Sequence, residues 1–176
     1  RFYNAAKKNK FKIIVRITGD CPLIDAEIVD NLIEKLIRYK KDYVTNTFPP
    51  TFPDGLDVEV FTFKALKRCY KLARSDYDKE HVTPFIKKSG KFSILNIKNI
   101  TDLSEHRWTV DKYNDLKVIR SIFNSYKPRI DFGWKSVMSL HKKKPSIFMH
   151  NKLSKLSEKK SSGQKLWKRA KKIIPG

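Results

Sequence analysis

Two aspartates follow runs of strand-forming residues at well-separated places in the chain. Asp20 comes after "FKIIVRITG" (residues 11–19), and Asp111 comes directly after "RWTV". Ligands of layered α/β sheets bind at the carboxyl ends of strands, so carboxylates at two such ends can converge on one cation. Mg²⁺ prefers a few carboxylates together with water and phosphate oxygens. The pattern therefore suggests a nucleotide-handling site with Asp20 and Asp111 as metal ligands.

Both aspartates also have a plain structural interpretation, which the pattern alone leaves open. Asp20 lies in a turn, whose backbone amides an aspartate can satisfy. Asp111 stands where it can cap a following helix. The six glycines are scattered, so the chain has no Gly-rich phosphate-binding loop. Either the chain is not a complete nucleotide enzyme, or such a loop precedes Arg1.

The elements that would position these residues alternate between strand and helix. Strands are expected over residues 11–18, 42–47, 56–63, 91–97 and 106–110. Helices are expected over residues 25–41, 64–73, 76–88 with a boundary near Pro84, 114–126 and 134–142. In the first helix Asp25 is the expected N-cap, and one apolar stripe comprises Ile28, Val29, Leu32, Ile33, Leu36 and Ile37. The alternation predicts an α/β layered sheet.

Length and composition set wide limits on the class of protein. The 176 residues, 40% of them hydrophobic and 12% aromatic, suffice for one globular domain with a core. No apolar run approaches the roughly 18–20 residues of a membrane span, so no membrane partner is expected. Cys21 and Cys69 lie far apart and without zinc-like spacing, which indicates free thiols and a cytoplasmic protein.

The formal net charge of +21 is concentrated in the tail, where residues 141–176 hold twelve Lys and Arg residues and one Glu. Such a tail suits a basic module that binds nucleic acid or a membrane surface. It lacks the interleaved aromatic residues of a recognition motif, so we favour a solvated basic linker over residues 141–162. Binding of nucleic acid is therefore not the leading expectation.

Four ordered stretches closely resemble the cytidylyltransferase family of spore-coat polysaccharide biosynthesis protein F, relatives of the CMP-sialic acid and CMP-KDO synthetases. They are "VRITGDCPLIDAEIVD", "DYVTNTFPPTFPDGLDVEVFTFKAL", "YDKEHVTPFI" and "RWTVDKYNDLKVI", and the match covers roughly residues 1–130. The resemblance implies a Rossmann-like α/β sandwich, the nucleotide-diphospho-sugar transferase fold. It also implies Mg²⁺-dependent transfer of a cytidylyl group from CTP to a sugar or sugar acid in surface polysaccharide biosynthesis, with pyrophosphate as the second product.

The same resemblance implies roles for individual residues. Asp20 and Asp111 match the two carboxylates that hold Mg²⁺, and Arg107 would act catalytically, close to the metal-bound phosphates. The residues beside the nucleotide would be Arg16, Gly19, Pro22 and Leu23. The residues on the acceptor side would be Asp57, Glu59, Glu80 and His81. Relatives often form homodimers, so a homodimer is also an expectation.

Two departures from the family pattern qualify these roles. Families of this kind begin with a strand and a basic Gly-containing loop, and the sequence from Arg1 onward contains neither. We therefore expect domain 1–140 to be the C-terminal portion of a nucleotidyltransferase domain, incomplete at the N-terminus and inactive alone. The family also reads Asp-Thr-Pro-Glu-Asp where this chain has "DKYND". From pattern alone, Glu59 also suits a solvent-facing position, and His81 a core or capping one.

The end of the chain carries a second, shorter resemblance. "SSGQKLWKRAKKIIPG" looks like the opening of glutamate-1-semialdehyde aminotransferases, which are class III enzymes dependent on pyridoxal phosphate (PLP). It implies that residues 163–176 are the first helix of a fused aminotransferase domain whose PLP site lies downstream. An ordinary amphipathic basic helix accounts for the same residues.

Overall fold

The structure, a computed structural model, describes residues 2–149, apart from the side chains of Lys79 and Glu80. The chain divides into two compact units, Arg1–His106 and Arg107–Gly176. Each unit is described below by itself. The expectation that residues 1–140 are the C-terminal portion of one nucleotidyltransferase domain stays a prediction.

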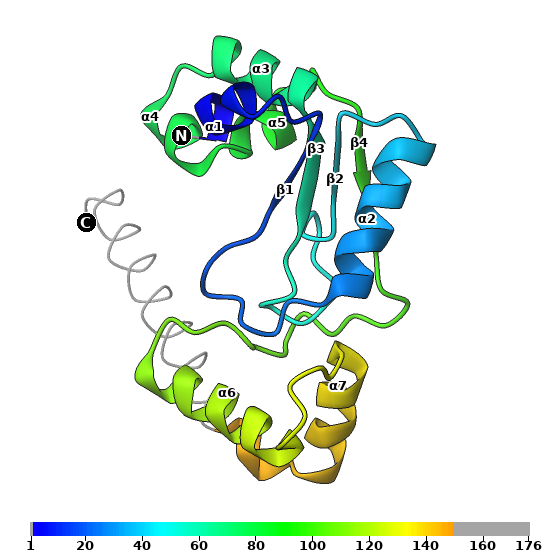
Figure 1. The fold of residues 1–176 in the computed structure, drawn as a ribbon, viewed down its shortest axis with the longest axis vertical. Helices are drawn as coiled ribbons and strands as arrows, with labels where there is room; N and C mark the ends of the chain where they lie inside the picture. The colour runs from blue at the N-terminus through cyan, green and yellow to red at the C-terminus, as the bar shows by residue number, and fades with distance from the viewer. Residues whose placement is uncertain (1, 150–176) are drawn as a thin grey trace, which may run out of the picture. The chain divides into compact units, whose positions relative to one another are not determined.

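A four-stranded sheet forms the centre of the first unit (Figure 1). Its spatial order is β1 (Ile13–Arg16), β3 (Glu59–Thr62), β2 (Tyr43–Thr45) and β4 (Ile94–Asn96). β3 runs antiparallel to both β1 and β2, and β2 runs parallel to β4. Consequently β1, β2 and β4 point the same way, and their carboxyl ends meet the beginning of β3 at one edge of the sheet.

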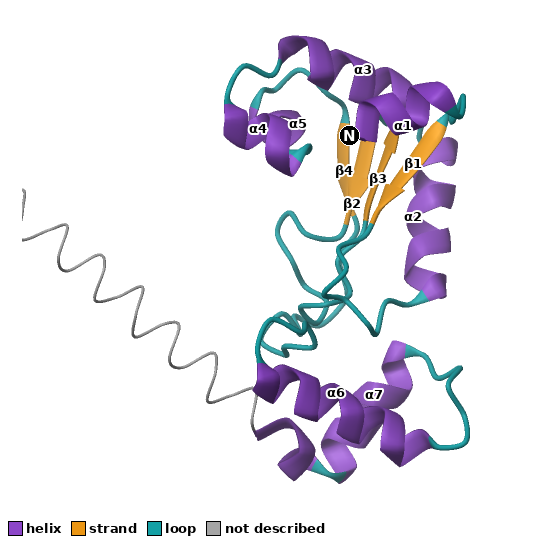
Figure 2. Ribbon diagram, turned by 60° about the vertical axis from the view of Figure 1, so that its left-hand side comes forward, coloured by secondary structure: helices purple, strands orange, loops and turns teal. Residues whose placement is uncertain are grey.

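Five helices of the described residues cover this sheet. They are α1 (Phe2–Lys8), α2 (Ala26–Arg38), α3 (Phe63–Leu72), α4 (Asp76–His81) and α5 (Pro84–Lys88). Figure 2 shows α2 on one side of the sheet and α4 and α5 on the other. One core cluster joins Ile14 and Phe61 of the sheet to Leu66 of α3 and Ile86 of α5. The sheet is therefore covered on both faces, as the α/β prediction requires.

Helix α2 forms as its sequence predicts. Asp25 is the N-cap, and its Oδ1 accepts hydrogen bonds from the backbone N–H groups of Glu27 at 2.9 Å and Ile28 at 3.4 Å. Leu32 and Leu36 are buried, whereas Ile37 is 59% exposed. The buried stripe is thus narrower than the predicted one, because Ile37 lies at its solvent-facing margin.

The second unit is helical in its described part. It contains α6 (Tyr113–Tyr126), α7 (Trp134–Lys143) and a 3₁₀ helix, η1 (Pro145–Phe148). The His141 ring of α7 stacks on the buried Phe148 ring of η1, with ring centroids 4.2 Å apart. The predicted linker over residues 141–162 therefore begins inside packed helix. The rest of that linker and the expected helix over residues 163–176 lie outside the described residues.

Three further sequence expectations differ from the structure. No strand forms over residues 106–110, although Trp108 in this stretch is fully buried. The His106 carbonyl accepts a hydrogen bond from the Asp54 N–H at 2.9 Å, but this bond is not continued as a strand ladder. Helix α1 was not predicted. The strands are shorter than predicted, since each ends where its chain leaves the ladder.

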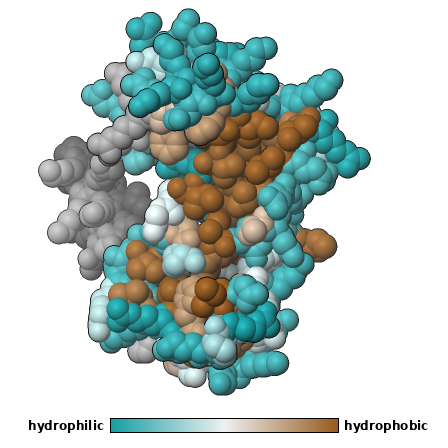
Figure 3. Space-filling view, in the orientation of Figure 1, coloured by the Kyte–Doolittle hydropathy of each residue, from teal (hydrophilic) through white to brown (hydrophobic). Residues whose placement is uncertain are grey.

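The described residues also show an edge strand and no membrane-spanning helix. β1 is an edge strand, and Figure 3 shows hydrophobic residues on the face over it. Within the described part of the chain, none of the helices has both the length and the apolar character needed to cross a membrane.

Candidate active site

A row of polar residues crosses the sheet at the edge where β1, β2 and β4 end. The strand register aligns Arg16 of β1 with Glu59 of β3, Glu59 with Thr45 of β2, and Thr45 with Asn96 of β4. The row exists because β3 begins where its neighbours end. It places charged and hydroxyl side chains at the edge where α/β sheets bind ligands.

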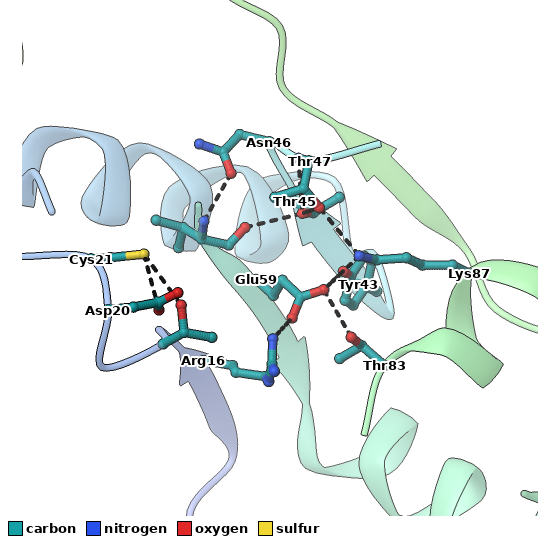
Figure 4. Close-up of polar contacts among 12 residues, drawn as sticks. Arg16, Asp20, Cys21, Tyr43, Thr45, Asn46, Thr47, Glu59, Thr83 and Lys87 are labelled. Carbon is teal, nitrogen blue, oxygen red and sulfur yellow. Dashed lines mark hydrogen bonds and ion pairs between the residues drawn. The ribbon is translucent and has the colours of Figure 1, made fainter. Parts of the chain in front are cut away.

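Glu59 is the centre of this row and is only 4% exposed. Its Oε2 accepts from Arg16 Nη1 at 2.5 Å, and its Oε1 accepts from Lys87 Nζ at 2.8 Å and Thr83 Oγ1 at 2.8 Å. The hydroxyl of Tyr43 also donates to Oε1 (Figure 4). Glu59 is thus not a solvent-facing residue, and its lone pairs are engaged by protein donors.

These contacts decide the charge state of the network. Burial alone would raise the pKa of Glu59, but the Lys87 ammonium and the hydrogen bonds from Lys87, Tyr43 and Thr83 outweigh it and lower the pKa. Burial, followed by the charge and hydrogen bond of Glu59, raises the pKa of Tyr43. Glu59 is therefore an anion at neutral pH, and Tyr43 a neutral donor.

The loop after β2 fixes the approach to β3. The side chain of Asn46 accepts from the Val58 N–H at 2.8 Å and donates to the Leu56 carbonyl at 2.7 Å. Thr45 Oγ1 donates to the Val58 carbonyl at 3.0 Å. These side chains extend the pairing of β2 and β3 beyond their backbone ladder, which fixes the backbone that carries Asp57 and Glu59.

The turn after β1 carries Asp20. The Cys21 thiol donates to Asp20 Oδ1 at 3.6 Å and lies 3.2 Å from Thr18 Oγ1 (Figure 4). Burial is the main cause that raises the pKa of Cys21 to about 11, so this thiol is neutral. A Cβ at Gly19 would meet no neighbouring atom within 4 Å. Pro22 is exposed and Leu23 is buried.

Asp57 lies near the same turn and has an unusual environment. It is half-buried, and among the described residues no hydrogen bond or ion pair reaches its carboxylate. Burial, together with the charges of Asp54, Glu59 and Asp20, raises the pKa of Asp57 to about 6, although Lys87 opposes the shift. A half-buried carboxylate held among other carboxylates is a common feature of functional sites.

The "EHVTP" stretch reaches the site through a residue that sequence reasoning did not select. Thr83, the N-cap of α5, donates to Glu59, and Lys87 lies one helical turn later. His81 is exposed and lies against the Tyr77 ring, with centroids 4.4 Å apart. The Glu80 side chain is outside the described part of the chain. The sequence did contain a signal for this pair: Pro84 marks the start of a helix, and Thr83 and Lys87 have the i, i+4 spacing that places two side chains on one helix face.

In the second unit Arg107 is held by two carboxylates. Its Nη2 lies 2.5 Å from Asp111 Oδ2 and 3.3 Å from Asp115 Oδ2. Asp115 is fully buried, and its Oδ2 accepts from the backbone N–H groups of Asp111 at 3.1 Å and Lys112 at 3.0 Å. The carboxylate that caps α6 is therefore Asp115, not Asp111, whose side chain is 49% exposed.

The two predicted metal ligands belong to different units, so the predicted pairing of Asp20 with Asp111 stays a prediction. Within the described residues, no group of three or more His, Cys, Asp and Glu side chains is arranged to hold a metal ion. The chemistry of the donors nevertheless suits Mg²⁺, because Asp20 lies among carboxylates whose charges raise the pKa of Asp57. Magnesium takes few protein carboxylates when water and phosphate supply the rest.

Comparison with known proteins identifies the family. Residues 1–128 match the family described as Cytidylyltransferase. The chain belongs to the cytidylyltransferase family. This match includes the polar row, the Asp20 turn and the beginning of α6.

Individual relatives agree with this assignment. An uncharacterized protein of Methanocaldococcus jannaschii is 39% identical over 121 residues, which are 67% of this chain and 49% of that protein. The spore coat polysaccharide biosynthesis protein SpsF of Bacillus subtilis is 26% identical over 149 residues, 82% of this chain and 61% of its own. The chain thus spans between about half and three fifths of these relatives.

A solved structure confirms the fold class. A cytidylyltransferase from Leptospira borgpetersenii superposes with a TM-score of 0.80 at 33% identity, covering 84% of this chain and 63% of the other. The expected α/β nucleotide-sugar transferase-like fold is therefore confirmed for this chain.

Proposed function

We propose that the protein transfers a cytidylyl group from CTP to a sugar or sugar acid and releases pyrophosphate, as a step in surface polysaccharide biosynthesis. The observation that carries this proposal is the buried charged row at the carboxyl edge of the sheet, in a chain of the cytidylyltransferase family. The name of the Bacillus subtilis relative supports the polysaccharide role. Dimerisation and a cytoplasmic location are further parts of the proposal.

The residues of the first unit suit such a transfer. Arg16 and Lys87 present cations at the edge of the sheet, where phosphate oxygens need charge compensation. Asp57 is a carboxylate without a hydrogen-bonding partner in the described structure, which suits an acceptor hydroxyl. Glu59 is engaged by its four donors, so its proposed role changes from contacting the acceptor to holding the two cations.

Asp20 and Asp111 would hold Mg²⁺, which in such a reaction neutralises the charge of the phosphate oxygens. Arg107 would lie beside them, with its guanidinium oriented by Asp115. The proposal names the acceptor only as a sugar or a sugar acid. A sugar that reacts through a hydroxyl needs a general base, whereas a sugar acid carries a carboxylate that can assist the reaction.

The test is pyrophosphate release by the product of the complete gene, supplied with CTP, Mg²⁺ and a panel of sugars and sugar acids. Asp20→Ala and Asp111→Ala should each lower kcat by at least about 100-fold, since each would remove a metal ligand. Asp102→Ala is the matched control, because Asp102 is an exposed carboxylate that bonds its own turn. Wild-type rates in either metal variant would contradict the metal assignment.

A further inference from the structure

Helix α5 brings to the polar row a lysine that neither the sequence reasoning nor the family match assigns to a role. Lys87 Nζ lies 2.8 Å from Glu59 Oε1 and 3.2 Å from Thr47 Oγ1. Its side chain is 23% exposed, so Lys87 is not fully enclosed by the protein. Figure 4 shows Lys87 and Arg16 reaching Glu59 from different directions.

Both cations retain hydrogen-bonding capacity. An ammonium has three N–H donors, and the contacts of Lys87 within the described chain use two of them. A guanidinium has five, and Arg16 bonds only Glu59 among the described residues. The Arg16 side chain is also 23% exposed. The edge of the sheet therefore offers N–H groups on two cations to a ligand.

The charges within the network are unequal. Glu59 is one carboxylate between two cations, and its other donors, Tyr43 and Thr83, are neutral hydroxyls. Glu59 carries one negative charge and contacts both Arg16 and Lys87, so this pair of cations holds one positive charge more than the carboxylate supplies. Asp57 also faces Lys87 electrostatically, yet no hydrogen bond or ion pair joins the two in the described structure.

We propose that Lys87 is a substrate-binding residue that, with Arg16, binds an oxyanion of the substrate, and that Glu59 is the positioning residue for both. The proposal rests on the proposed function and adds a residue and a ligand chemistry to it. The oxyanion is a phosphate group of the nucleotide or the carboxylate of a sugar acid, since both offer oxygens to N–H donors on cations.

The experiment compares Lys87→Met with Lys88→Met in the product of the complete gene. Lys88 is the matched control because it is the next residue of α5, is exposed, and lies 5.5 Å from the Tyr77 ring centroid, away from Glu59. Steady-state kinetics should show KM raised about tenfold or more in Lys87→Met for one substrate, with a smaller change in kcat. Lys88→Met should stay within about twofold, and Lys87→Arg should recover most of the loss.

The substrate whose KM rises identifies the source of the oxyanion. A rise for CTP assigns a nucleotide phosphate, and a rise for the acceptor assigns its carboxylate. Unchanged KM for both substrates in Lys87→Met would overturn the proposal, because a purely structural Lys87 would lower the melting temperature alone. Thr47→Val, which removes the second contact of Lys87, should raise the same KM by a smaller factor and serves if Lys87→Met does not fold.

The role of Glu59 is tested by combination. Glu59→Gln should raise the same KM. Adding Lys87→Met to it should produce little further change, because both substitutions disturb the same set of contacts. If the two substitutions raise the KM independently, so that their factors multiply in the double variant, Glu59 does not position Lys87. If the wild type releases no pyrophosphate, the proposed function fails. Calorimetric binding of inorganic pyrophosphate and of a sugar acid to the same variants then still decides whether Lys87 binds an oxyanion.

Discussion

Glu59 and Asp57 are two residues apart, yet the structure gives their carboxyl groups opposite properties. Glu59 is buried and bonded by Arg16, Lys87, Tyr43 and Thr83, and its pKa is lowered. Asp57 is half-buried without a hydrogen bond or ion pair from the described residues, and its pKa is raised to about 6. A carboxylate satisfied by protein donors holds its neighbours in place, whereas one without such donors is suited to bind a ligand.

The raised pKa of Asp57 predicts a change of stability with pH. Its ordinary value is 3.8 and its folded value about 6, so the folded state disfavours the ionised form. The free energy of unfolding should therefore fall as pH rises from about 4 to 6, and the whole penalty is present at pH 7. Asp57→Asn removes it and should stabilise the protein by roughly 1–2 kcal/mol at pH 7, measured by urea unfolding, because solvent screening of this half-buried group reduces the roughly 3 kcal/mol to which the shift corresponds.

Near pH 3.5 the same comparison should show almost no gain from Asp57→Asn, because Asp57 is then largely protonated in both states. Asp102→Asn, an exposed carboxylate outside the cluster, provides the control. An equal gain for Asp57→Asn at both pH values would show that the effect is not electrostatic.

At the level of elements, the site depends on where strands and helices begin and end. The antiparallel β3 lies between β1 and β2, so its first residue, Glu59, meets the last residues of its neighbours. Helix α5 begins at Thr83 and places Lys87 on the same face one turn later. In the second unit, α6 begins with Asp115, whose buried carboxylate satisfies backbone N–H groups and orients Arg107.

The start of α6 gives a prediction about stability. Asp115→Asn keeps the size of the side chain but removes a buried negative charge that faces Arg107 and two backbone N–H groups. It should lower the free energy of unfolding by about 2–4 kcal/mol, followed by far-UV circular dichroism in urea. Asp111→Asn removes the exposed partner of the same arginine and should cost less than about 1 kcal/mol. Equal costs would contradict the assignment of Asp115 as the buried anchor.

For the whole molecule, local sequence patterns predicted those features that depend on neighbouring residues in the chain. The α/β class, the Asp25 cap and the break at Pro84 follow from hydrophobic periodicity and capping, and the structure confirms them. The Glu59 network was not predictable in this way, because Arg16, Thr83 and Tyr43 are 43, 24 and 16 residues away from Glu59. Only the register of a mixed sheet brings them together, and a single sequence does not encode that register in a local motif.

The resemblance to a family supplied candidate site residues that local patterns could not, and the structure adds the contacts that those residues make. It directed attention to "GLDVEVF" and "EHVTP", whose residues Glu59 and Thr83 do meet. It assigned Glu59 and His81 to the acceptor, and this assignment stays a prediction; in the structure Glu59 is bonded by protein donors, and the His81 ring lies against the Tyr77 ring. A family motif thus predicts which residues lie near the site, whereas the side-chain contacts in the structure show what each residue bonds to.

The central claim concerns the bond that is formed, and labelled CTP tests it most directly. The product of the complete gene is incubated with Mg²⁺, the panel of sugars and sugar acids, and CTP labelled at either the α- or the γ-phosphate. The account predicts that the α-label appears in a new cytidylylated sugar, while the γ-label leaves as pyrophosphate. Recovery of both labels in CTP with every acceptor, or of the α-label in free CMP alone, would contradict it.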